Sequence, residues 1–88
     1  MKNDEEAKAS LQRIRDAGVL PGQRYRHYAT QTIYLVTAVG LNEPDLEPLV
    51  HYRDAADEYA IVWTRQLHVF TGRALADNEF VQRFTQVE

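Results

Sequence analysis

The stretch Arg24–Tyr28 places two arginines, a histidine and two tyrosines within five residues. Side chains alternate along a β-strand, so Tyr25 and His27 would share one face of it. The opposite face would carry two guanidinium groups beside a ring, from Arg24, Arg26 and Tyr28. Such a face can hold a carboxylate or a phosphate through paired hydrogen bonds, or a nucleobase by stacking.

A structural explanation of the same stretch competes with recognition. Arg26 would pair with a loop carboxylate such as Glu43 or Glu47, while Tyr25 or Tyr28 closes a small barrel. We favour this explanation, because small barrels routinely lock their rims with polar pairs of this kind. The sequence alone leaves open whether the stretch is a binding site or a barrel rim.

A second group of aromatic and basic residues lies further along the chain. Tyr52 precedes Arg53, and Trp63 shares one strand face with Ile61 and Arg65. Five rings could line a groove of the kind that binds proline-rich peptides: Tyr25, Tyr28, Tyr52, Tyr59 and Trp63. For Trp63 we favour a place in the core or in a groove wall over a platform for a ligand.

The residue types give little support for catalysis or metal binding. The three histidines, His27, His51 and His68, are spread over separate segments, and the chain has no cysteine and no HxH or HExxH spacing. The only serine, Ser10, falls in a predicted helix, and no glycine-rich phosphate loop is present. We therefore expect no cofactor, no metal and no catalytic residue, and favour binding over enzymatic activity.

The charge of the chain argues against a typical nucleic-acid-binding domain. Its 88 residues carry a formal net charge of −3, with a pI of about 5.5. The acidic residues gather in three predicted loops, Glu43–Glu47, Asp54–Glu58 and Asp77–Glu79. The first residues lack an apolar leader, and no stretch is apolar for long enough to span a membrane. Since a cysteine-free chain also suits a reducing compartment, we expect a cytoplasmic protein without a membrane partner.

Residues 1–18 are predicted to form an N-terminal helical extension. Ala7, Leu11 and Ile14 recur at helical spacing, and Gly18 supplies the left-handed residue that ends many helices. The apolar stripe is too narrow for an independent helix, so it must cover either the domain or a partner subunit. We favour a monomer with a self-covering helix over a homodimer through Leu11, Ile14 and Val19, because sheet edges need shielding.

Residues 19–88 show the two-residue period of β-strands and are predicted to form one barrel domain of about five short strands. A helical turn or a strand continuation is expected at Gln66–Phe70. Asp77-Asn78 tolerates the positive φ of a two-residue hairpin turn. The strands are expected at Arg24–Tyr28, Thr32–Val39, Leu49–Arg53 and Tyr59–Arg65, with a final hairpin of Arg73–Ala76 and Glu79–Phe84.

Six short motifs follow one another in the order and spacing of the bacterial DUF1653 family, which this chain resembles from about Pro21 to Val87. They are Tyr25–Tyr28, Tyr34–Val36, Val50–Tyr52, Trp63–Arg65, Val69-Phe70 and Arg83-Phe84. The resemblance implies a small SH3-like β-barrel of unknown function. The chain departs from the family at its His-Ser-Glu-Thr loop, which here reads Leu41-Asn42-Glu43-Pro44. Any family site in that loop is therefore altered.

Three hypotheses for function follow. The first is a non-catalytic module of the mainly β, SH3-like class that recognises a peptide or protein partner through a Tyr/Trp/Arg surface. The second is single-stranded RNA or DNA binding through Arg24, Arg26, Tyr28, Arg53 and Arg65, against which the acidic pI argues. The third is a small-molecule or catalytic site near His27, Glu43 and Arg65.

Overall fold

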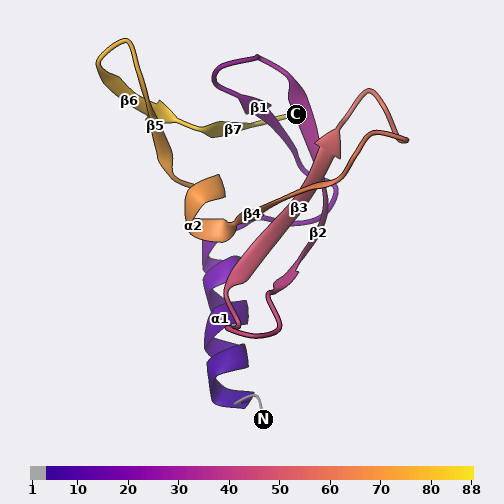
Figure 1. Ribbon diagram of the computed structural model, residues 1–88, viewed down its shortest axis with the longest axis vertical. Coiled ribbons are helices and arrows are strands. Elements are labelled where there is room, and N and C mark those ends of the chain that lie inside the picture. The colour runs from indigo at the N-terminus through magenta and orange to yellow at the C-terminus, as the bar shows by residue number, and fades with distance from the viewer. Residues whose placement is uncertain (1–3) are drawn as a thin grey trace.

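Five antiparallel strands form the main sheet, in the order β4–β3–β2–β1–β7. The computed structural model describes residues 4–88, and its sheet curls into a half-barrel (Figure 1). The strands are β1 (Arg24–His27), β2 (Ile33–Leu41), β3 (Pro48–Asp54), β4 (Trp63–Gln66) and β7 (Phe84–Val87). The predicted mainly β class with one N-terminal helix is confirmed.

The long strand β2 is the centre of the sheet, as expected for a β-branched segment with two apolar faces. It pairs with β1 through Tyr25 and Tyr34, and with β3 through Val36 and Tyr52. The register with β3 shifts between Val36 and Ala38. A bulge of this kind bends a strand and increases its twist, which helps to curl the sheet.

Helix α1 (Asp4–Ala17) packs beside β2 and β3. The first three residues of the predicted helix lie outside the described residues. Ile14 and Val19 are buried in the same core as the sheet, whereas Leu11 stays 39% exposed. The helix ends at Gly18, whose φ is +71° and whose N–H donates to the carbonyl of Ile14. Through Ile14 and the following Val19, α1 covers the sheet of its own chain.

A short helix, α2 (Leu67–Phe70), directly follows β4 and confirms the helical alternative for this segment. Its Phe70 ring stacks on Phe84 with a centroid distance of 4.3 Å and meets Tyr25 edge-on at 5.0 Å. The buried core contains these residues together with neighbours from β2, β3, the helices and the segment after α1: Ile14, Val19, Val36, Val50, Tyr52 and Leu67. Leu67 and Phe70 thus tie α2 to the sheet.

Strands β5 (Arg73–Ala76) and β6 (Glu79–Gln82) form a separate hairpin that projects from the half-barrel (Figure 1). Asp77 and Asn78 at its tip have φ values of +50° and +68°, so the predicted turn is confirmed. Leu75 and Phe80 are cross-strand partners and are 60% and 71% exposed.

Two strand predictions were wrong. The segment Tyr59–Arg65 is a strand only from Trp63 onward, because the carboxylates of Asp54 and Asp57 accept backbone N–H groups and hold the preceding residues in turns. The segment Glu79–Phe84 is broken at Arg83, whose N–H donates to the carbonyl of Gly72 and whose carbonyl accepts from Tyr28. Phe84 therefore leaves the hairpin and begins β7, beside β1.

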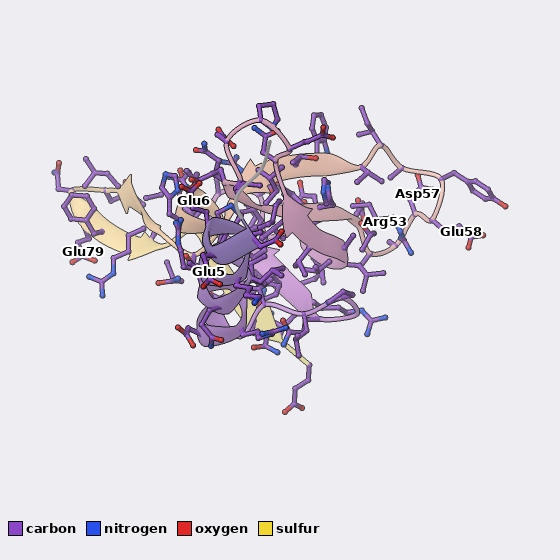
Figure 2. The ribbon with its side chains drawn as sticks, turned by 90° about the horizontal axis from the view of Figure 1, so that it is seen from below. Glu5, Glu6, Arg53, Asp57, Glu58 and Glu79 are labelled. Atoms are coloured by element: carbon purple, nitrogen blue, oxygen red, sulfur yellow. The ribbon has the colours of Figure 1, made fainter. Side chains whose placement is uncertain are left out.

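Several acidic residues lie on projecting parts of the molecule. Figure 2 shows Asp57 and Glu58 in the loop after β3, and Glu79 in the β5–β6 hairpin on the opposite side. Glu5 and Glu6 belong to the first turn of α1. Among the helices of residues 4–88, none combines the length and the apolar character needed to cross a bilayer.

Candidate functional site

The inner face of the half-barrel holds a cavity of about 300 Å³, which we call the barrel pocket. Every strand of the main sheet contributes to it, because the register brings their inward residues together. His27 lies opposite Phe84, and Tyr52 lies opposite Trp63. The lining consists of His27, Thr30, Tyr34, Tyr52, Trp63, Arg65 and Phe84.

The pocket is walled by rings that hold one another in place. Tyr34 meets Tyr52 edge-on at 5.2 Å, and Tyr52 meets Phe84 at 5.3 Å. The ring of His27 lies 5.1 Å from Phe84. Edge-to-face contacts of this kind are favourable beyond the burial of area, so they stabilise the arrangement of the rings in the wall. Trp63 keeps half of its surface exposed while it lines the pocket, which leaves an aromatic face for a ligand.

Arg65 is positioned by two contacts inside the pocket. Its Nε donates a hydrogen bond to the Tyr52 hydroxyl at 2.9 Å, and its Cζ lies 5.9 Å from the centroid of Phe84. The second contact is a cation–π interaction. Within residues 4–88, no other hydrogen bond of the Arg65 side chain is found, so its terminal nitrogens have donors to spare.

His27 is held as a neutral ring. Its Nδ1 accepts a hydrogen bond from the backbone N–H of Ala29 at 3.2 Å, so the proton of the neutral form lies on Nε2. Burial lowers the pKa of His27, and the positive charges of Arg65 and Arg83 lower it further. The neutral ring is thus a hydrogen-bond donor near the positive charges of Arg65 and Arg83.

Four of the nine predicted site residues meet in this pocket: His27, Tyr52, Trp63 and Arg65. Three arginines lie on the opposite face instead, since Arg24 and Arg53 are in register with Leu35 and Arg26 with Ile33. Arg53 donates to the carbonyl of Asp54 at 2.9 Å and lies on the same side of the molecule as the acidic loop (Figure 2).

Arg26 and Tyr28 line a different hollow of about 340 Å³, between the outer face of the sheet and the β5–β6 hairpin. The predicted pairing of Arg26 with Glu47 is wrong, because Glu47 contacts Arg13 at 3.7 Å and His68 at 3.1 Å. Tyr25 occupies the core position that the structural explanation offered to Tyr25 or Tyr28.

Glu43 lies in the turn between β2 and β3, beyond the end of β2 that is remote from the barrel pocket. Tyr34 and Leu41 are separated by seven residues of strand, or about 23 Å. The structure therefore does not bring Glu43 to His27 and Arg65. The remaining histidines are also apart, since His51 contacts Thr64, and no group of metal-ligating side chains gathers within residues 4–88.

The sequence-based selection missed Thr30, Tyr34 and Phe84 as lining residues. Tyr34 could have been found, because the alternation of an antiparallel hairpin places it on the face of Tyr25 and His27. Phe84 had no such signal, since its place depends on the pairing of β7 with the distant strand β1.

Comparison with known proteins identifies the family. No curated protein and no solved structure was found to match the chain. A family model described as "Protein of unknown function (DUF1653)" matches residues 23–86. That range includes every residue of the barrel pocket and all strands apart from the last residue of β7, and it leaves α1 outside. Because the match covers most of its length, the chain belongs to the DUF1653 family.

Proposed function

We propose that this protein is a non-catalytic binding module that holds a short segment of a peptide or protein partner in the barrel pocket. The observation that carries the proposal is the half-exposed ring of Trp63 beside the fixed guanidinium group of Arg65. Tryptophan, tyrosine and arginine are the residues that most often dominate binding energies at protein interfaces. The pocket combines all three on one wall.

The lining supports binding better than catalysis. It contains no carboxylate, cysteine or serine, so a pair of catalytic carboxylates and a serine or cysteine nucleophile are absent from the described lining. His27 alone could exchange a proton near neutral pH, and its Nδ1 is already engaged by Ala29. Recognition needs only the shape, the rings and the donors that are present.

The apolar surface continues outside the pocket. Tyr59, Ile61 and Val62 precede Trp63 in the loop between β3 and β4, and they are 90%, 64% and 50% exposed. A partner segment with one residue in the pocket could lay its neighbours over this loop. The family's implied SH3-like class, in which exposed aromatic residues bind peptides, supports the same proposal.

Single-stranded nucleic acid remains a second prediction, although the arrangement favours it less. Of its five residues, Arg24, Arg26 and Arg53 lie on the outer face of the sheet and Arg65 on the inner one. A single base could still stack on Trp63 beside Arg65. Its affinity would fall steeply between about 50 and 200 mM salt, whereas binding of an apolar residue would change little.

The proposal is tested by selecting a random 12-residue peptide library, displayed on phage with free peptide C-termini, on the protein. Selected peptides are then synthesised and titrated while the emission of Trp63, the only tryptophan, is recorded. We expect enriched sequences with a shared apolar or aromatic residue, and a change in Trp63 emission on binding. Trp63→Ala, followed by calorimetry, should weaken binding at least tenfold.

Phe80→Ala is the matched control, because Phe80 is an exposed ring that lies on the β5–β6 hairpin and outside the pocket lining. It should leave the affinity unchanged. Peptides that bind the Trp63→Ala and wild-type proteins equally would place the binding surface elsewhere. A library that yields no enriched sequence would argue against a peptide-binding module.

A further inference from the structure

The barrel pocket has a marked charge asymmetry. Among the described residues that line it, Arg65 is the one permanent charge, and no carboxylate faces it across the cavity. The whole chain, in contrast, carries a net charge of −3. A partly buried guanidinium group without an acidic partner in the pocket lining favours an anionic ligand.

The hydrogen-bond donors of the pocket reinforce this asymmetry. Arg65 donates a hydrogen bond through Nε to the oxygen of Tyr52, so its two terminal nitrogens remain available as donors. In residues 4–88 no acceptor is found for the hydroxyl proton of Tyr52, whose oxygen already accepts from Arg65. His27 offers its Nε2–H, since Nδ1 is taken by Ala29. Each of these three side chains therefore has a hydrogen-bond donor for which no acceptor is found within residues 4–88.

The other lining residues favour a ligand that also carries an apolar group. Trp63 and Tyr34 present partly exposed rings to the cavity, and the buried ring of Phe84 closes it from below. Its volume of about 300 Å³ is at the lower end of the range for ligand pockets, which suits one side chain with its attached group rather than a long segment. The ligand therefore needs an acidic group and an apolar group close together.

We propose that the barrel pocket binds the C-terminal residue of a peptide, with its carboxylate on the guanidinium of Arg65 and its apolar side chain against the half-exposed ring of Trp63. A terminal residue joins the two groups through one carbon atom, as the small cavity requires. A planar guanidinium matches a carboxylate through two parallel hydrogen bonds. The inference rests on the proposed function and specifies which part of a partner enters the pocket.

The pKa of His27 is lowered mainly by burial and further by the positive charges of Arg65 and Arg83, and this second cause agrees with the assignment. A bound carboxylate would offset those charges. An ammonium or methylammonium ligand would add to them, so the aromatic rings do not form a cage for a cation. The chemistry of the pocket thus selects the sign of the ligand's charge.

The test compares three probes by Trp63 emission and by calorimetry at about 150 mM salt. The first is the peptide Ac-Gly-Ser-Gly-Ser-Phe with a free C-terminal carboxylate, and the second is the same peptide as its C-terminal amide. The third, 3-phenylpropionate, carries the carboxylate and the ring without a peptide. We expect the acid peptide to bind at least tenfold more tightly than the amide, and more tightly than 3-phenylpropionate.

Variants then assign the effect to Arg65. Arg65→Gln should remove the preference for the acid, and Arg65→Lys should retain part of it, since the charge stays while the planar fork is lost. Phe80→Ala should bind all three probes as the wild type does. The comparison of acid with amide on the wild-type protein does not depend on any variant folding correctly.

Each remaining outcome overturns a stated part of the inference. Equal binding of acid and amide peptides, both lost in Trp63→Ala, would refute the carboxylate site and leave the proposed function standing. Binding of 3-phenylpropionate as tightly as the acid peptide would assign the pocket to free carboxylic acids. If neither peptide binds while library-selected peptides bind through Trp63, the terminal-residue assignment is wrong. If those also fail, the proposed function is wrong.

Discussion

Phe84 is predicted to support both the core and the barrel pocket, and its truncation should show this dual role. The side chain is 3% exposed, stacks on Phe70 at 4.3 Å and meets Tyr52 at 5.3 Å. Phe84→Ala removes these contacts and leaves a cavity, for which losses of about 3–5 kcal/mol in the free energy of unfolding are typical. The loss should be at the upper end, because Arg65 also rests on this ring.

The assay is urea denaturation followed by far-ultraviolet circular dichroism, with Phe80→Ala as the control. Phe80 is 71% exposed, so its truncation should change the free energy of unfolding by less than about 0.5 kcal/mol. A domain of this size has a total stability of only about 4–13 kcal/mol, and Phe84→Ala could leave little folded protein. Phe84→Leu, with an expected loss of about 1–2 kcal/mol, then provides the measurement.

A loss below about 1 kcal/mol for Phe84→Ala would refute this reasoning. It would mean that β7 does not hold Phe84 against Phe70 and Tyr52 in solution. The barrel pocket would then lack the ring on which Arg65 lies, and the charge arrangement inferred for it would fail as well.

Two further predictions concern the helix and the pH dependence. Ile14→Ala should lower the free energy of unfolding by about 2–4 kcal/mol and the more exposed Leu11→Ala by less than about 1 kcal/mol in urea titrations; equal losses would contradict the packing of α1. Because the pKa of His27 is lowered in the folded state, its contribution to stability is present above pH about 6.5 and is lost as the pH falls through the folded pKa. An NMR titration of the His27 ring should show the lowered pKa, and Arg65→Gln should shift it upward; an unchanged pKa in this variant would contradict the charge on Arg65 as a cause.

Local patterns predicted those parts of the fold that are determined locally. The alternation along Arg24–His27, the end of α1 at Gly18 and the turn at Asp77-Asn78 all follow from backbone preferences or from the two-residue period. The break at Arg83 depends instead on Gly72, at the other end of the β5–β6 hairpin, and on Tyr28, which lies far away along the chain. No local pattern carries that information.

The same distinction explains the partial prediction of the site. Aromatic and basic residues on strands marked His27, Tyr52, Trp63 and Arg65 as candidates, and all four line the pocket. Sequence could not tell which face of each strand would become the inside of the curled sheet. Arg24, Arg26 and Arg53 have the same chemistry as Arg65 but lie on the other face, and only the register separates them.

The pairing of β1 with β7 has a consequence for the order of folding. Strands β1 to β4 follow one another as neighbours in the sheet, so each can join across a short loop. His27 and Phe84, in contrast, face each other although more than fifty positions separate them along the chain. Closing so long a loop costs conformational entropy before the contacts between β1 and β7 can compensate for it. We therefore expect β7 to dock after strands β1 to β4 have paired. The barrel pocket needs Phe84, and it is therefore expected to be among the last parts of the molecule to assemble.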